Sequence, residues 1–426
     1  MNVKKIYQSS LVYLALMSPT SVFAESLAIV NATVHTVTEQ GILNNATVII
    51  DNGVITAINP AELSADTVFD AEGRILTPGL IGSMNQLGLV EVSAVSRTRD
   101  ASDKKADITF DPSVAFNPKS SVIPYSRKGG ITSNIVVPRG GESAFKGQAF
   151  IVNLSGDFDS VVNTQSAAIV NLGSKSEGSR AMTLQKIYRT FEDAHKKMLK
   201  ANDKKNTEEA KKDKISEDKA DTKEPKRVDK AINRVLSREQ PLLAYADRAT
   251  DILQLIKLKE AFDIDMIIAG ARDATSVAPQ LAKSGIPILY RTLTTLPSFD
   301  ALHASLSSTA TLVAAGVIVG FTVDGDTHNL YQLRFDAGIA VANGLTKEQA
   351  LAAVTANIAD AFHYNAGRIA VGKKADLVLW SADPFELSTR VEKMWIDGQE
   401  QETKSRQDAL RDRYMSTSAM PRAYSK

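Results

Sequence analysis

The stretch LTPGLIGSMNQLGLVEV, residues 76–92, opens the main part of the fold. Its first residues, 76–81, form a short apolar run of the length expected for a buried β-strand. Seven more runs of this kind follow, at residues 131–137, 149–154, 167–172, 242–246, 266–269, 286–290 and 317–322. Helix-length segments separate the last four runs, at residues 249–262, 274–284 and 299–315. This alternation predicts an α/β fold with a (β/α)8 barrel, in which run 149–154 or 167–172 could belong to an excursion hairpin.

β-rich segments lie on both sides of this region in the sequence. Residues 27–70 contain two runs joined by Asn52-Gly53, which predicts a hairpin at the start of a small β-sandwich. Strand patterns return at residues 375–380 and 391–396. The residues after 401 are polar and indicate a short helix and a tail.

Composition limits the classes of protein that the chain can form. The 426 residues are 43% hydrophobic, which is enough for a large core, and the formal net charge is +1. This balance gives no reason to expect a nucleic-acid partner. Because the chain has no cysteine, it can form no disulfide and no thiolate metal site.

Residues 196–230 differ from the rest of the chain in composition. They hold 13 Lys or Arg and 9 Asp or Glu, with few large apolar side chains, so they cannot cover a core. We expect a charged insertion in the barrel, either a solvated helical pair or a disordered loop. An interaction arm is the functional alternative to a purely solvated insertion.

The N-terminus carries the pattern of a secretory signal peptide. Lys4 and Lys5 precede an apolar run at residues 11–17, and the small-residue site Val22-Phe23-Ala24 follows. We predict cleavage after Ala24 and export, with the bacterial periplasm as the expected compartment. A membrane anchor is the alternative, but the apolar run is too short to span a bilayer. No membrane insertion is expected after cleavage.

Four separated blocks resemble the amidohydrolase superfamily, including imidazolonepropionase-like and dihydroorotase-like enzymes. They are VFDAEGRILTPGLI (68–81), the segment from VDGDTHNLYQL to ADAF (323–362), GRIAVGKKADLVLWSADPFE (367–386) and TRVEKMWIDGQ (389–399). The resemblance implies a (β/α)8 barrel with a sandwich built from both ends of the chain. The expected organisation is a signal peptide (1–24), a composite sandwich (25–74 and 366–401), a barrel (75–365) and a polar tail (402–426).

The resemblance also implies one or two divalent metals at the carboxyl-terminal mouth of the barrel. Family members hold them with a histidine pair on strand one, a lysine or glutamate after strand four, histidines on strands five and six, and an aspartate on strand eight. The metals activate water, and the aspartate moves its proton. In this sequence these positions fall on Met84 and Gln86, near Asn171, on or near Tyr245, near Gly270, and on Asp324.

Only Asp324 keeps the residue type that the family uses. A thioether, an amide and a phenol do not hold zinc as imidazole does, so the standard metal site is expected to be lost and no cofactor is assigned. Carboxylates at Asp324 and Asp326 could instead hold a weakly bound calcium or magnesium ion.

Candidate site residues follow from position at the barrel mouth. Asp324 and His328 are the catalytic candidates, since a histidine beside a carboxylate can act as a general base. Gln86, Tyr245 and Arg291 are the candidates for substrate binding. The structural alternative is that the residues after strand eight cap the next helix.

Two functions remain open at this point. The first is hydrolysis of a carbon–nitrogen bond in a non-peptide or cyclic amide, which the resemblance implies. The second is a catalytically inactive protein that binds a small molecule or a partner subunit. Self-association, or pairing with an intact relative that keeps its histidines, would fit the second function.

Overall fold

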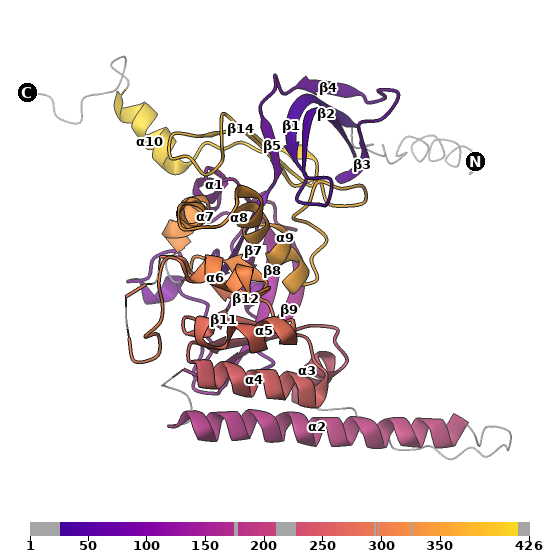
Figure 1. Cartoon of the computed structure of the whole chain (residues 1–426), viewed down its shortest axis with the longest axis vertical. Helices are drawn as coiled ribbons and strands as arrows, with labels where there is room; N and C mark the ends of the chain where they lie inside the picture. The colour runs from indigo at the N-terminus through magenta and orange to yellow at the C-terminus, as the bar shows by residue number, and fades with distance from the viewer. Residues whose placement is uncertain are drawn as a thin grey trace, which may run out of the picture.

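The computed structural model describes residues 26–173, 178–209, 227–293, 295–296, 298–324 and 327–415 (Figure 1). The predicted signal peptide, Asp326 and residues 210–226 of the charged insertion lie outside the described residues. Two eight-stranded sheets organise the described chain. No helix of the described ranges is both long and apolar enough to cross a membrane.

The first sheet is built from both ends of the described chain. Its strands are β1 (Leu27–His35), β2 (Ile42–Asp51), β3 (Val54–Ile58), β4 (Thr67–Asp70), β5 (Ile75–Pro78), β14 (Leu377–Trp380), β15 (Val391–Ile396) and β16 (Gln399–Glu400). β5 pairs antiparallel with β14, which joins the N-terminal and C-terminal strands. The predicted hairpin joins β2 to β3, and both turn residues have positive φ, 50° at Asn52 and 76° at Gly53, as a tight hairpin turn requires.

The second sheet curves into a nearly closed barrel. Its strands, in sequence order, are β6 (Leu80–Asn85), β7 (Ile131–Val136), β8 (Phe145–Asn153), β9 (Val161–Asn171), β10 (Leu242–Ala246), β11 (Met266–Gly270), β12 (Ile288–Tyr290) and β13 (Val319–Phe321). Where the first and last strands approach each other, the Thr322 hydroxyl donates to the Ser83 carbonyl at 2.8 Å. The α/β class and the barrel are confirmed.

One strand runs antiparallel to its neighbours, at run 149–154, which was one of the two candidates for an excursion hairpin. β8 is antiparallel to both β7 and β9, whereas the other pairs in the barrel are parallel. The connections on either side of β8 are too short for a helical crossover, so only a meander can form there. The side of the barrel at β8 is therefore covered by the loop segment after β6, from which the Phe110 carbonyl accepts the Gln148 amide at 2.8 Å.

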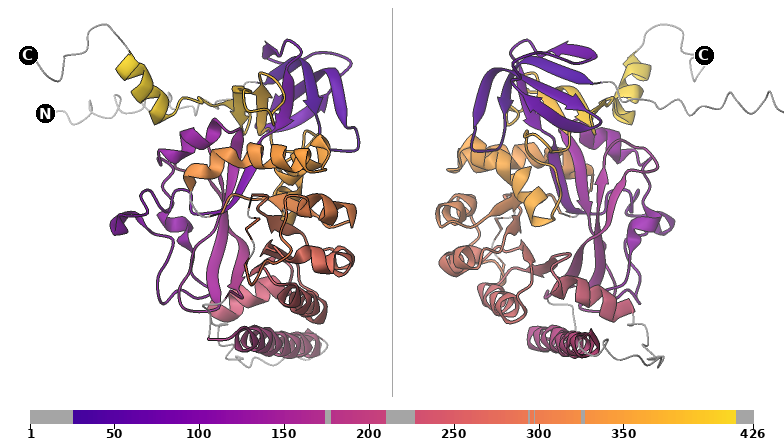
Figure 2. Two further views of the ribbon diagram at one scale, coloured as in Figure 1. Left: turned by 60° about the vertical axis from the view of Figure 1, so that its left-hand side comes forward. Right: turned by 90° about the vertical axis from the view of Figure 1, so that its right-hand side faces the viewer.

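Helices cover the opposite side of the barrel (Figure 2). The helices of the described chain are α1 (Val122–Arg127), α2 (Arg180–Glu209), α3 (Arg227–Leu236), α4 (Ala249–Phe262), α5 (Ala278–Ser284), α6 (Ser308–Ala314), α7 (Leu333–Ala342), α8 (Lys347–Ala353), α9 (Ala356–Ala361) and α10 (Arg406–Met415). The prediction for residues 249–262 is confirmed by α4. The prediction for residues 299–315 is wrong over its first half, because only α6 is helical there and Asp300 is held by two arginines instead.

Helix α2 carries the start of the charged insertion. It packs through a stripe of buried residues spaced three or four apart, namely Thr183, Ile187, Phe191 and Ala194. The Phe191 ring lies 5.8 Å from that of Phe262 at the end of α4. The predicted helical form is therefore found on both sides of residues 210–226, in α2 and α3.

A buried tryptophan joins the two sheets. Trp380 is fully buried at the end of β14, and its indole nitrogen donates to the Thr77 hydroxyl at 2.9 Å. Gly130 lies against the ring with φ +82°, and a Cβ there would come within 2.2 Å of it. The Arg334 guanidinium lies 5.7 Å from the ring. This packing fixes the first sheet at the amino-terminal end of the barrel, away from the mouth.

Candidate functional site

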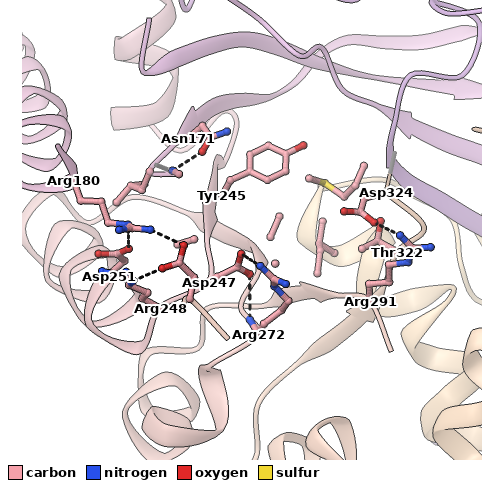
Figure 3. A pocket seen from close by; sticks show the side chains of 18 residues that line it. Asn171, Arg180, Tyr245, Asp247, Arg248, Asp251, Arg272, Arg291, Thr322 and Asp324 are labelled. Atoms are coloured by element: carbon pink, nitrogen blue, oxygen red, sulfur yellow. Dashed lines mark hydrogen bonds and ion pairs between the residues drawn. The ribbon is translucent and has the colours of Figure 1, made fainter. Parts of the chain in front are cut away.

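A pocket opens at the carboxyl ends of the barrel strands (Figure 3). Its volume is about 390 Å³, which suits a small molecule. Most of the lining residues lie at or just beyond the ends of β6, β9, β10, β11, β12 and β13, with one more from α2, one from α4 and one from the segment before α6. They are Met84, Asn171, Leu172, Gly173, Arg180, Tyr245, Ala246, Asp247, Arg248, Asp251, Ala269, Gly270, Arg272, Leu289, Arg291, Thr322, Asp324 and Asp300.

Met84 lies at the base of the pocket in a strained conformation. Its φ is +65°, and the pairing of β6 with β7 shifts register between Ser83 and Asn85, so Met84 forms a β-bulge. Such a backbone costs on the order of 1–3 kcal/mol for a side chain other than glycine. The buried thioether joins the apolar cluster inside the barrel. The bulge therefore places a sulfur, and no charged or imidazole group, at this point of the pocket.

The same bulge turns Gln86 away from the pocket. Gln86 is buried, its amide nitrogen donates to the Val137 carbonyl at 3.3 Å, and its amide oxygen accepts from Arg139 Nε at 3.3 Å. The structure does not place Gln86, a predicted substrate-binding residue, among the residues that line the pocket, because residues two apart share one face of a strand only where no bulge intervenes. Gln86 instead fixes the loop that follows β7.

Arg291 and Asp324 form an ion pair on one side of the pocket. Arg291 Nη1 lies 2.8 Å from Asp324 Oδ1, and the Asp324 side chain keeps 57% of its surface exposed. Below them, burial raises the pKa of Asp336 on α7 to about 6, while the Arg291 charge opposes this shift and the Asp324 charge adds to it. The predicted residues Arg291 and Asp324 thus meet in the pocket, but as partners of each other.

A denser network lies on the other side of the pocket. Arg180, the first residue of α2, reaches Asp251 Oδ2 at 3.3 Å and Asp300 Oδ2 at 2.7 Å. Arg248 Nε donates to the second oxygen of Asp300. Burial raises the pKa of the Asp251 carboxyl, and the Arg180 and Arg248 charges oppose that shift. Asp300 therefore bridges two arginines and ties the segment before α6 to α2 and α4.

A third ion pair lies between these two groups. Arg272 Nη2 lies 2.8 Å from Asp247 Oδ2, and the Arg272 backbone amide approaches Asp247 Oδ1 at 3.4 Å. Gly270 lets the carboxylate approach, since a Cβ at this position would lie 2.6 Å from Asp247 Oδ1 and the φ of Gly270 is +92°. A histidine at position 270 would therefore displace Asp247.

Tyr245 projects into the pocket between the charged groups (Figure 3). Burial raises the pKa of its phenol well above the usual value; the Asp324 charge adds to this and the Arg139 charge opposes it. The phenol is therefore neutral and can both donate and accept a hydrogen bond. Its placement agrees with its predicted position at the mouth.

His328 does not line the pocket. It is exposed on a short 3-10 helix, Thr327–Gln332, that precedes α7. The structure therefore gives no support to the prediction of a base formed by His328 and Asp324 together. Asp326, the second carboxylate of the predicted cation site, lies outside the described residues.

Sequence reasoning missed four of the charged groups that line the pocket, namely Arg180, Asp251, Arg272 and Asp300. Arg180 and Asp300 are 120 positions apart, and neither belongs to a barrel strand. Arg272 carried a usable signal, because it lies two residues beyond the end of β11, where barrel proteins place site residues.

The fold is that of a barrel protein with a pocket at the carboxyl ends of its strands. Residues 250–400 match the amidohydrolase family. Amidohydrolase tasK from Hapsidospora irregularis is 22% identical over 397 residues, which cover 82% of this chain and 39% of tasK. The chain thus spans well under half the length of that curated relative.

Solved structures extend the comparison. An amidohydrolase from Thermotoga maritima MSB8 superposes with a TM-score of 0.76 at 25% identity, over 88% of this chain and 99% of that one. An adenosine deaminase from Xanthomonas campestris with bound zinc has a TM-score of 0.51 at 14% identity, over 91% and 99% of the two chains, and shows the same fold. The chain belongs to the amidohydrolase superfamily, as its sequence predicted.

The residues at this mouth do not fit the metals that the family implies. Within the described ranges, no group of three or more His, Cys, Asp or Glu side chains is placed to hold a metal ion. At the mouth, the structure places a thioether at Met84, a neutral phenol at Tyr245 and a carboxylate at Asp324 that pairs with Arg291. Zinc requires three or four nitrogen, sulfur-anion or carboxylate ligands, which this set does not supply.

Proposed function

We propose that this protein binds a small molecule at the barrel mouth and has lost the metal-dependent hydrolysis of its superfamily. One observation carries the proposal: the pocket holds Met84 at its base, and the carboxylate of Asp324 pairs with Arg291. A carboxylate that is engaged by a guanidinium and a neighbouring thioether do not make up the set of three or four ligands that a catalytic zinc requires. A pocket of about 390 Å³ with polar lining groups supports recognition of a small molecule without metal chemistry.

Hydrolysis of a carbon–nitrogen bond is the second candidate. The observation in its favour is that Asp324 is exposed, lines the pocket, and stands just beyond the last barrel strand. In this case Asp324 would take a proton from the water that attacks the carbonyl carbon, and Arg291 would stabilise the developing oxyanion. Asp324 would then return the proton to the amine nitrogen as the carbon–nitrogen bond breaks. The protein would then be a metal-independent amidohydrolase.

Metal content and turnover separate the two candidates. The full chain is purified without added metal, its zinc, calcium and magnesium are quantified, and cyclic and linear amides are assayed before and after chelation. We expect less than one metal ion per chain. We also expect no amide hydrolysis by the wild-type protein beyond the level of the Asp324→Asn variant. Stoichiometric metal with chelator-sensitive turnover would overturn the proposal, and metal-free turnover lost in Asp324→Asn would establish the second candidate.

Export to the periplasm is part of the proposal and rests on the N-terminal sequence pattern. Cell fractionation and the N-terminal sequence of the mature protein test it, with cleavage after Ala24 as the expected result. We also propose that the protein associates with another chain, either a second copy or an intact relative. Co-purification from the native source with a histidine-bearing relative would support pairing, and recovery of monomers alone would count against any association.

A further inference from the structure

The charges that line the pocket cancel each other. The described lining residues include four guanidinium groups and four carboxylates: Arg180, Arg248, Arg272, Arg291, Asp247, Asp251, Asp300 and Asp324. Each of the eight groups lies in an ion pair with another of them. The pocket is therefore formally neutral, although charged groups surround it.

This pairing determines which ligand charge the pocket can accept. A purely anionic ligand would take a guanidinium from its aspartate and leave that carboxylate without a partner in a partly desolvated site. A purely cationic ligand would leave a guanidinium unpaired in the same way. Loss of one partner of such a pair is costly, because the remaining charge keeps its desolvation penalty. A ligand with both charges can replace both partners at once.

The Arg291–Asp324 pair is the one that a ligand can most readily separate. It rests on one contact of 2.8 Å, and Asp324 is the most exposed of the four carboxylates at 57% of its side-chain surface. By contrast, Asp300 is held by two arginines and Asp247 is held by both the side chain and the backbone of Arg272. Those pairs serve as the fixed wall of the pocket.

We propose that the pocket binds a small zwitterion of the α-amino acid type, with the ligand carboxylate on Arg291 and the ligand ammonium on Asp324. This proposal rests on the ligand-binding function proposed above. The uncharged part of the ligand lies against Met84, Ala269 and Leu289, which line the pocket and belong to the apolar cluster inside the barrel. An aliphatic side chain on the ligand fits these neighbours.

Three leucine compounds with different charges test the proposal. L-Leucine is a zwitterion, N-acetyl-L-leucine is an anion and L-leucinamide is a cation, and all three carry the same aliphatic body. Isothermal titration calorimetry on the full chain at pH 7 measures their affinities. We expect L-leucine to bind roughly ten- to a hundredfold more tightly than either derivative, since each derivative loses one charge-assisted hydrogen bond.

Two variants should reverse this preference in opposite directions. Asp324→Asn frees Arg291 from its partner, so N-acetyl-L-leucine should overtake L-leucinamide. Arg291→Gln frees Asp324, so L-leucinamide should overtake N-acetyl-L-leucine. A matched control is Arg368→Gln, which breaks the exposed pair of Arg368 with Asp360 (2.6 Å) outside the pocket and should leave all three affinities unchanged. A variant that merely disturbed the fold would weaken all three probes alike.

The possible failures point to different conclusions. Tighter binding of N-acetyl-L-leucine than of L-leucine, equal binding of the three probes, or no binding at millimolar concentration would overturn the zwitterion proposal. Release of free L-leucine from N-acetyl-L-leucine or L-leucinamide, measured by chromatography on the same samples, would instead contradict the non-catalytic function. L-Leucine preference without release supports both.

Discussion

Replacement of Asp376 by asparagine should change how the stability of this protein depends on pH. Asp376 is buried where the first sheet meets the barrel, and its carboxylate accepts the Asp397 amide at 2.8 Å and the Tyr364 hydroxyl at 3.4 Å. Burial raises the pKa of Asp376 from 3.8 to about 6, against the opposing charge of Lys374. A shift of about two units corresponds to about 3 kcal/mol of differential stability.

The sign follows from the direction of this shift. The unfolded chain releases the Asp376 proton near pH 4, whereas the folded protein keeps it until about pH 6, so rising pH favours unfolding across this window. The destabilisation is absent below about pH 4 and complete above about pH 6. Asparagine keeps an acceptor for the Asp397 amide and carries no charge. The Asp376→Asn variant should therefore gain up to about 3 kcal/mol over wild type at pH 7.5 and nothing at pH 4.

Urea unfolding of both proteins at half-unit steps from pH 4 to 8 measures this difference. Taking the difference between the two proteins removes the contributions of other titrating groups. The exposed Asp159→Asn serves as the control and should stay within about 0.5 kcal/mol of wild type at every pH. A difference between Asp376→Asn and wild type that does not vary with pH would refute the reasoning.

Three other substitutions test the site and its support. Gly270→Ala puts a Cβ 2.6 Å from Asp247 Oδ1 at a residue whose φ is +92°. The free energy of unfolding in urea should therefore fall by about 1–3 kcal/mol, and a fall of less than about 0.5 kcal/mol would contradict the stated contact. Arg334→Met removes the guanidinium that donates to the carbonyls of Pro384, Glu386 and Thr389, so the free energy of unfolding should fall by about 3 kcal/mol or more. Arg334→Lys should recover only part of this loss, because lysine cannot reproduce the fork of donors. Full recovery by lysine would show that charge alone matters. The double variant Met84→His/Gln86→His should contain no stoichiometric zinc by metal analysis, because the side chain at position 86 faces away from the pocket. One zinc ion per chain would show that the variant does not retain the bulge in β6.

Much of the fold could be predicted from the sequence, because local patterns determine it. The hairpin turn at Asn52-Gly53 could be predicted from its residue types, because asparagine and glycine accept positive φ. Apolar runs marked most of the barrel strands, but run 76–81 covers the end of β5 in the first sheet as well as the start of β6, and β9 begins at Val161, before run 167–172. The sequence left open which of runs 149–154 and 167–172 belongs to a hairpin, because a buried apolar run looks the same whichever way the strand points. Only the short connections of β8 impose its antiparallel pairing.

The site was less predictable, for two physical reasons. The bulge at Met84 reverses the facing of Gln86, and a sequence read by strict alternation assigns Gln86 to the wrong side. The ion pairs join residues far apart in the chain, as Arg180 does with Asp300. Tyr245 lies near the carboxyl end of β10, and Arg291 and Asp324 follow β12 and β13; residues at these positions lie at the mouth of a barrel.

The antiparallel β8 also bears on the order in which the barrel forms. β7, β8 and β9 follow one another with short connections, so their contacts close small loops at low entropic cost. Pairing of β9 with β10 must wait for closure of the much longer segment that contains α2 and α3. Contacts between residues close in sequence form faster than contacts between distant residues. We therefore expect the meander of β7, β8 and β9 to fold first, and the parallel strands β10 to β13 to add to its edge afterwards. Since most pocket residues follow strands of that second half, the binding site should be among the last parts of the barrel to assemble.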